Sequence, residues 1–144
     1  MKPLISVIIP TYNRIHKLKK AIDSVFHQTF QDWELIVVDN CSNDGTEGFI
    51  KSLDNNKVRF YSINNQGIIA ASRNLGINNS KGKYIAFLDD DVLLDLNYYE
   101  EIEKVFLKYP TALGVHGYNK LVDNSYQKMK NSFIQSLIYK FEKF

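Results

Sequence analysis

Short apolar runs rich in β-branched residues alternate along the chain with segments whose apolar residues recur at helical spacing. The runs predict strands over residues 4–9, 33–39, 58–62, 84–88 and 113–118. The intervening segments predict helices over residues 15–26, 68–80 and 96–109, with a further short helix after the turn at 41–46. Because these strands are largely apolar and alternate with helices, we expect an α/β fold in which helices cover both faces of a mainly parallel sheet.

Residues 123–144 differ from this pattern. Apolar side chains recur there at three- and four-residue spacing from Met129 to Phe144, and residues 123–144 also carry four lysines. We therefore expect an α/β domain over residues 1–122 and a C-terminal amphipathic helix over residues 123–144. Residues 126–144 could pack back on the domain, contact a second copy of the chain as a homodimer, or lie on an anionic membrane surface.

Composition narrows the class of protein. A chain of 144 residues, 44% of them hydrophobic, is large enough for one buried core, and its net charge of +2 is too balanced to predict a nucleic-acid partner. The single Cys41 excludes an intrachain disulfide and a multi-cysteine zinc site. No apolar run approaches the ~20 residues of a membrane-spanning helix, and the N-terminus lacks the pattern of a signal peptide. We expect a cytoplasmic protein, with peripheral contact at the inner face of the membrane left open.

Polar side chains follow three of the predicted strands. Residues 10–14 (PTYNR) follow the first strand, Asp39 ends the second, and Asp89, Asp90 and Asp91 follow the fourth. Ligands of open parallel sheets bind beyond the carboxyl ends of the strands, so these four carboxylates should gather at one edge. Adjacent aspartates repel one another, and a divalent cation relieves that repulsion. Carboxylate oxygens suit Mg²⁺ or Mn²⁺, with phosphate and water completing the coordination. The pattern therefore predicts a metal-phosphate site.

The three aspartates also have a simpler interpretation, as a polar turn in which Asp91 or Asp95 caps the next helix. Asp95 is the better candidate for such a cap. The position of the triplet after an apolar strand, with Asp39 at a second strand end, favours the metal.

Arg73 lies on the helix predicted over residues 68–80, which is entered through Asn65, Gln66 and Gly67. Free N–H groups and the positive end of the helix dipole favour anions at such a terminus. The apolar neighbours of Arg73 predict a largely buried helix, and a buried arginine needs an acidic partner or a phosphate. Asp39, the aspartate triplet or a bound phosphate would serve.

Four motifs in this order resemble the family 2 glycosyltransferases of the GT-A fold. They are VIIPTYNR at 7–14, VVDNCSNDGT at 37–46, ASRNLG at 71–76 and FLDDD at 87–91. The resemblance covers residues 3 to 118, the N-terminal nucleotide-sugar-binding part of such an enzyme. It implies a Rossmann-like three-layer sandwich that stops before the acceptor-binding half.

The resemblance further implies an inverting, hexosyltransferase-type enzyme of polysaccharide synthesis. Such an enzyme moves a sugar from a nucleotide diphosphate, often UDP, to a hydroxyl of a saccharide or lipid-linked acceptor. By this resemblance Asp39 would bind the nucleobase, Asp90 the ribose or sugar, and Asp91 the Mn²⁺ or Mg²⁺ that bridges the diphosphate. The nucleotide-binding residues that it implies are Pro10, Thr11, Asn13, Arg14, Asp39, Arg73, Asp89 and Asp90.

The family's catalytic base is an acid in a motif well downstream of the triplet, and no such motif is visible here. Asp123 and Glu142, the acids beyond Glu103, do not stand in a matching context. We therefore name no catalytic residue and expect this chain to supply the donor- and metal-binding half. The alternatives are a non-catalytic nucleotide-binding or assembly module and a metal-dependent phosphotransfer domain. The PTYNR and ASRN motifs have no part in a phosphotransfer site.

Overall fold

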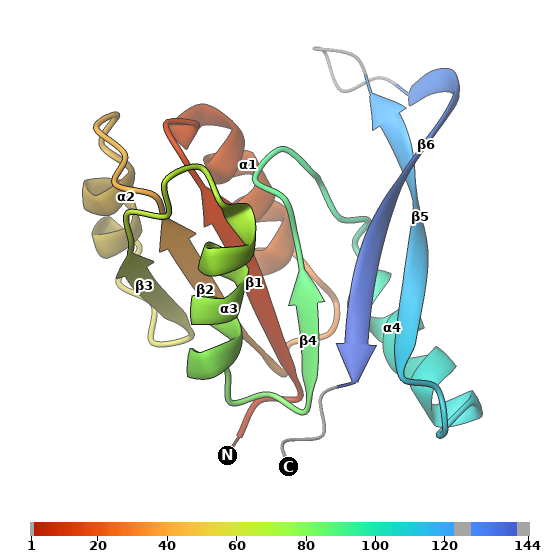
Figure 1. Ribbon diagram of the computed structural model, residues 1–144. Coiled ribbons are helices and arrows are strands. Elements are labelled where there is room, and N and C mark those ends of the chain that lie inside the picture. The colour runs from red at the N-terminus through yellow and green to blue at the C-terminus, as the bar shows by residue number, and fades with distance from the viewer. Residues whose placement is uncertain (1, 123–127, 141–144) are drawn as a thin grey trace.

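The computed structural model of the chain describes residues 2–122 and 128–140, which form one sheet with helices packed on it (Figure 1). The strands are β1 (Ile5–Thr11), β2 (Trp33–Asp39), β3 (Val58–Ser62), β4 (Tyr84–Phe87), β5 (Gly114–Val122) and β6 (Lys128–Lys140). The helices are α1 (Ile15–Phe26), α2 (Thr46–Ser52), α3 (Ile69–Asn79) and α4 (Tyr98–Lys108).

The sheet has the strand order β3-β2-β1-β4-β6-β5. β1 pairs in parallel with β2 and β4, and β2 pairs in parallel with β3, so the four strands that come first in the chain are parallel. β6 is antiparallel to both of its neighbours. The predicted mainly parallel sheet is confirmed. The order reverses at β1, since β2 lies on one side of it and β4 on the other.

Two apolar cores lie on opposite faces of the sheet. All seven residues of β1 are buried, and alternate residues serve the two cores. Val7 and Ile9 belong to the larger core, which contains residues of α1, α2 and α4, whereas Ile8 belongs to the smaller one, against which residues of α3 pack. In Figure 1 α3 lies in front of the sheet and α1 behind it. This arrangement confirms the expected three-layer sandwich.

Helix α3 approaches the sheet closely through small residues. Ser72 and Gly76 are its buried residues, and a Cβ added at Gly76 would lie 2.5 Å from Cγ2 of Ile8. Ile68 and Ile69 at its start are exposed by 59% and 49%. The expectation of a largely buried helix was therefore wrong. Small residues form the face turned to the sheet, and the apolar residues at the start of the helix are exposed.

The C-terminal helix predicted over residues 123–144 is also wrong. Lys128–Lys140 forms strand β6, which pairs with β5 and, near its end, with β4 through Ile85↔Tyr139. Residues 123–127 and 141–144 lie outside the described residues. The suggested dimer or membrane contact through residues 126–144 was based on an apolar helical face. Because residues 128–140 form a strand, that face does not support either contact. None of the helices in the described ranges combines the length and the apolar character needed to cross a membrane.

One carboxylate organises the first two helix starts. Asp44 Oδ2 accepts a hydrogen bond from the N–H of Ile15, the first residue of α1, at 2.8 Å. Asp44 Oδ1 accepts from the N–H and the hydroxyl of Thr46, the first residue of α2, at 3.2 and 2.7 Å. Burial opposes ionisation of Asp44, but these hydrogen bonds prevail and lower its pKa. Asp44 thus fixes both helix starts relative to the strand ends.

Candidate nucleotide-binding site

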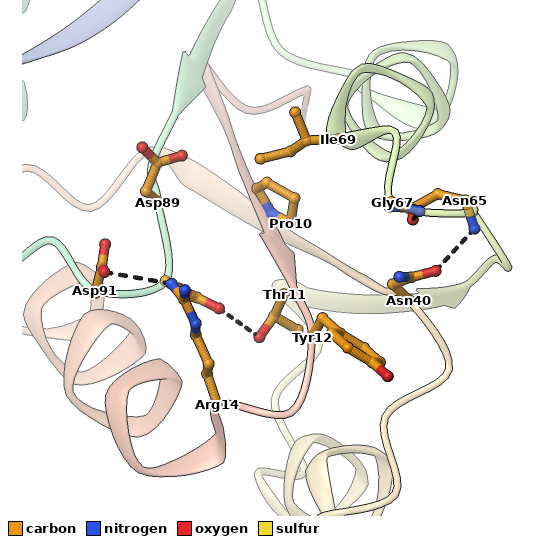
Figure 2. Close-up of a pocket in the computed structure, with 11 residues that line it drawn as sticks. Pro10, Thr11, Tyr12, Arg14, Asn40, Asn65, Gly67, Ile69, Asp89 and Asp91 are labelled. Carbon is orange, nitrogen blue, oxygen red and sulfur yellow. Dashed lines mark hydrogen bonds and ion pairs between the residues drawn. The ribbon is translucent and has the colours of Figure 1, made fainter.

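A pocket of about 380 Å³ lies where β1 and β4 diverge, at the carboxyl ends of the parallel strands. Its walls come from the end of β1, the residue after β2, the start of α3 with the preceding loop, and the segment after β4 (Figure 2). The lining residues are Pro10, Thr11, Tyr12, Arg14, Asn40, Asn65, Gly67, Ile69, Asp89, Asp90 and Asp91. The pocket therefore occupies the point where the strand order reverses, which is the usual ligand site of such sheets.

Asp90 is the buried member of the aspartate triplet, exposed by only 5%. Its Oδ2 accepts a hydrogen bond from the Thr11 hydroxyl at 2.8 Å, and its Oδ1 lies 3.3 Å from Nη1 of Arg14. Burial raises the pKa of Asp90, while the Thr11 hydroxyl and the Arg14 guanidinium oppose that rise. Asp90 ties the segment after β4 to the end of β1 and forms part of the pocket wall.

Asp91 is the accessible member, with a side chain that is 40% exposed. Its Oδ2 lies 3.4 Å from Nη1 of Arg14 and 3.4 Å from Nζ of Lys17 (the Arg14 contact is drawn in Figure 2). The alternative in which Asp91 or Asp95 caps the next helix is not observed. The N-cap residue of α4 is Asn97, and among the described residues no side chain makes a capping hydrogen bond there.

Asp89 pairs with Arg73, whose Nη2 donates a hydrogen bond to Oδ1 of Asp89 at 2.9 Å. The guanidinium of Arg73 also lies over the ring of Phe87, 5.5 Å from its centroid. The expectation that Arg73 would have an acidic partner is confirmed, and that partner belongs to the triplet. Nε of Arg73 is buried without a hydrogen-bond partner among the residues that the structure describes.

Asp39 is buried and binds the turn that follows β2. Its carboxylate accepts hydrogen bonds from the N–H of Ser42, at 2.9 Å, and from the Ser42 hydroxyl. Asn13 joins the same network, because its N–H donates to Oγ of Ser42 at 2.8 Å and its Oδ1 accepts from the N–H of Asn43 at 2.9 Å. Asp39 and Asn13 thus connect the turns after β1 and β2.

The site residues expected from the sequence divide into two sets. Those that line the pocket are Pro10, Thr11, Arg14, Asp89, Asp90 and Asp91, whereas Asn13, Asp39 and Arg73 do not line it. Arg73 contacts a lining residue, and Asn13 and Asp39 hold the turns beside the pocket. Asp39 as a ligand of the nucleobase and the roles expected of the other residues stay predictions.

Five residues that line the pocket were not among the expected site residues: Tyr12, Asn40, Asn65, Gly67 and Ile69. Tyr12 is 55% exposed, and together with Asn40 and Gly67 it also lines an adjoining pocket of about 410 Å³. Asn40 Oδ1 accepts a hydrogen bond from the N–H of Asn65 at 2.8 Å, which joins the end of β2 to the loop before α3. Four of these residues carried a signal in the sequence. Tyr12 lies inside PTYNR and Asn40 directly follows Asp39, while Asn65 and Gly67 stand at the entry to the helix predicted over residues 68–80.

The carboxylates fit a divalent cation only in part. No group of three His, Cys, Asp or Glu side chains that could hold a metal occurs within residues 2–122 and 128–140. Mg²⁺ is commonly held by one or two carboxylates, with substrate phosphates and water as its other ligands. Asp91 is exposed and lines the pocket, so it can supply such a ligand once a phosphate is present.

Comparisons with known proteins give the family. The model for glycosyl transferase family 2 matches residues 6–144. An uncharacterized glycosyltransferase of Rickettsia felis is 40% identical over 138 residues, which are 92% of this chain and 21% of that protein. WfgD of Escherichia coli, a UDP-Glc:alpha-D-GlcNAc-diphosphoundecaprenol beta-1,3-glucosyltransferase, is 30% identical over 122 residues, 85% of this chain and 48% of that protein.

A solved structure has the same fold. S. aureus TarS 1-349 in complex with UDP matches with a TM-score of 0.69 and 25% identity, over 74% of this chain and 33% of that chain. The chain thus spans less than half of the length of each of these three proteins. The family match over nearly all residues, the four motifs and the GT-A architecture agree. This chain belongs to glycosyltransferase family 2.

Proposed function

We propose that this chain binds a nucleotide diphosphate sugar, UDP-linked, for an inverting hexosyl transfer to an acceptor hydroxyl in glycan synthesis. The observation that carries the proposal is the pocket at the strand-order reversal, where the aspartate triplet faces polar and aromatic side chains. WfgD is named for UDP-Glc and a diphosphoundecaprenol acceptor, and TarS was solved with UDP. These names support a UDP-linked donor and a saccharide or lipid-linked acceptor.

The end of the pocket near Tyr12 suits a nucleobase. The exposed ring of Tyr12 offers a flat surface for stacking, and the polar walls beside it include the amides of Asn40 and Asn65. Amide groups both donate and accept hydrogen bonds, so they match the edge of an uncharged base such as uracil. Asp39 directly precedes Asn40 in the sequence. In this proposal Asp39 binds the base after it has released its hydrogen bonds to Ser42.

The other end of the pocket suits the diphosphate. Arg14 and Lys17 bring positive charge to the Asp91 side of the pocket, and Arg73 brings it to the Asp89 side. In the proposal Asp91 holds Mn²⁺ or Mg²⁺, which would stabilise the charge that develops on the leaving diphosphate. Asp90, held by Thr11, keeps the segment after β4 in place while the donor binds.

Inverting transfer also requires a base that deprotonates the acceptor hydroxyl during its attack. The carboxylates that line the pocket within the described residues are those of the triplet, and each has a cationic or hydroxyl partner. We assign no general base to any of them. Without an assigned base, a second candidate function is that the chain binds the nucleotide or assembles with a partner without catalysing transfer.

Calorimetry tests the proposal. UDP should bind the chain more tightly with Mn²⁺ than with EDTA, and more tightly than GDP or CMP under the same conditions. Asp91→Asn should weaken the Mn²⁺-dependent binding by about tenfold or more, because even outer-shell partners of protein-bound metals are worth that much. Asp95→Asn makes the same charge change at an exposed site in the same loop region, and should leave UDP binding unchanged.

Metal-independent UDP binding, unaffected by Asp91→Asn, would contradict the metal role of Asp91. Turnover of a UDP-sugar by this chain would exclude the non-catalytic candidate. We also place the donor reaction in the cytoplasm, a reducing compartment that suits the exposed and unpaired thiol of Cys41.

A further inference from the structure

Two cations converge on the accessible carboxylate of the triplet. Arg14 is the N-cap residue of α1 and Lys17 lies in the first turn of that helix. Nη1 of Arg14 and Nζ of Lys17 both lie 3.4 Å from the same oxygen, Oδ2 of Asp91. Nη1 of Arg14 also lies 3.3 Å from Oδ1 of Asp90. A guanidinium and an ammonium group thus balance two adjacent carboxylates.

The two cationic side chains supply the same positive charge to these carboxylates as one divalent cation would. Asp90 and Asp91, when ionised, carry two negative charges, and Arg14 and Lys17 carry two positive charges. One divalent cation would supply the same positive charge in a smaller volume. The side chains of Arg14 and Lys17 are 53% and 55% exposed, so both can leave Asp91 without a large packing cost. Exposed ion pairs of this kind are weak enough to exchange for a stronger ligand.

We infer that Lys17, with Arg14, neutralises Asp91 in the metal-free protein and is displaced from Asp91 when a divalent cation binds there. The inference rests on the proposed metal-binding role of Asp91 and adds Lys17 as a positioning residue. Once displaced, the two side chains remain tethered beside the pocket, and their positive charges are no longer neutralised by Asp91. They would then attract the diphosphate of the donor.

This exchange couples the metal to the nucleotide. Cation binding has to overcome the pairs made by Lys17 and Arg14, which weakens the affinity for metal alone. The same event exposes positive charge to the diphosphate, which strengthens nucleotide binding in the presence of metal. Because such coupling is reciprocal, nucleotide should raise the affinity for metal by the same factor.

Lys17→Gln tests the exchange through two binding measurements. Binding of Mn²⁺ alone, followed by the loss of the free-ion electron paramagnetic resonance signal, should tighten by about two- to fivefold, the range expected for loss of an exposed ion pair. The factor by which Mn²⁺ strengthens UDP binding should fall in the same variant. Lys17→Arg keeps a positive charge and should restore the wild-type values of both quantities.

Lys19→Gln is the matched control, because it removes the same charge from the same helix. Nζ of Lys19 lies 4.9 Å from the ring centroid of Phe49, so it belongs to a different contact. Equal Mn²⁺ affinities for Lys17→Gln and Lys19→Gln would overturn the inference, and so would weaker Mn²⁺ binding by Lys17→Gln or no Mn²⁺ binding at all. Failure of UDP to bind the wild type, with Mn²⁺ binding still tightened in Lys17→Gln, would overturn the nucleotide proposal and leave the exchange standing.

Discussion

Asp44 shows how much a single side chain contributes to this fold. Its two carboxylate oxygens accept hydrogen bonds from the first residues of α1 and α2, which lie in different parts of the sequence. Helix N-termini present N–H groups that lack partners within the helix, and a carboxylate satisfies them and complements the helix dipole. One residue in a loop thus orders two helices at the edge of the pocket.

Asp44→Ala should lower the free energy of unfolding by about 2 kcal/mol, since a single lost cap costs up to about that much and two helix starts are affected. The contribution should depend on pH. Folding lowers the pKa of Asp44 below its ordinary value of 3.8. Stability from the ionised form is therefore fully present above that ordinary value and is lost as the pH falls through the lower, folded-state pKa.

Urea unfolding of the wild type and Asp44→Asn over a falling series of pH values measures this effect. The difference in stability between the two proteins should be largest near neutral pH and should narrow in acid. Asp32→Asn changes an exposed aspartate outside this network and should show little difference from the wild type at any pH. A constant difference between the wild type and Asp44→Asn across the series would contradict the ionic cap.

The place of the aspartate triplet in the fold was predictable from the sequence, but the different exposure of its three residues was not. The sequence was sufficient to predict that these acids follow a buried strand and lie near other polar residues. Their separation into a buried Asp90 and the accessible Asp89 and Asp91 depends on the turn of the backbone after β4. Three identical residues in a row carry no signal of that difference. The contact between Lys17 and Asp91 was likewise not predictable, because it joins side chains that are distant in sequence.

At the scale of single elements, α3 is defined by how little side chain it places against the sheet. Gly76 faces Ile8 so closely that an additional methyl group would overlap it. Such contact lets the helix axis lie near the strands and directs the start of α3 toward the pocket, where Gly67 and Ile69 form part of the wall. The glycine is thus required by packing, although alanine has the higher helix propensity.

Gly76→Ala should destabilise the protein by about 1–3 kcal/mol, the usual cost of overpacking, despite a gain in helix propensity of about 1 kcal/mol. Gly48→Ala in α2 is the matched control, because apart from its own helix no atom of the described residues lies within 4 Å of the added Cβ. That variant should be more stable than the wild type by up to about 1 kcal/mol. Thermal or urea unfolding gives both values. A Gly76→Ala protein as stable as the Gly48→Ala protein would contradict the packing argument.

Strand β6 shows where element prediction fails. The three- and four-residue spacing of apolar residues between Met129 and Phe144 is a local pattern, and it favoured a helix. The strand is instead defined by backbone pairing with β5 and with β4, which lies far away in the sequence. In contrast, the bounds of β2 and β3 were predicted correctly, because apolar β-branched runs and flanking turn residues coincide there.

At the scale of the whole molecule, the two ends of the parallel strands differ: one end forms the pocket and the other holds a buried polar cluster. The pocket lies at the carboxyl ends, whereas a buried polar cluster centred on Glu34 lies near the amino ends. Glu34 accepts hydrogen bonds from the Ser6 hydroxyl at 2.5 Å, the Lys81 N–H at 2.6 Å and Nη2 of Arg59 at 2.5 Å. The cluster joins β1, β2 and β3 to the turn before β4, about 17 Å from the end of β2.

Glu34→Ala should therefore lower the free energy of unfolding and leave the affinity for UDP nearly unchanged. Removing one member of a largely buried ion pair leaves its partners unsatisfied, at a cost of about 3 kcal/mol. The affinity of the folded variant for UDP should stay within about twofold of wild type, because the sites are distant and share no partner. Urea unfolding and calorimetry on the same preparation measure the two quantities.

Glu47→Ala removes an exposed carboxylate that pairs with Lys51 at 2.7 Å, and should cost only about 0.3–0.5 kcal/mol. A large loss of UDP affinity in the folded Glu34→Ala protein would show that the two ends of the sheet are not independent.

The pocket forms only when β4 is paired with β1. The hydrogen bond between Thr11 and Asp90 spans 79 positions in the sequence, so the pocket is completed only after the chain has closed that long loop. The unit formed by β1, β2 and β3 can assemble before this happens, from contacts over shorter separations. Local opening of β4 would therefore abolish the pocket while leaving half of the sheet folded. Amide hydrogen exchange in β4 consequently reports on the binding-competent population more directly than global unfolding does.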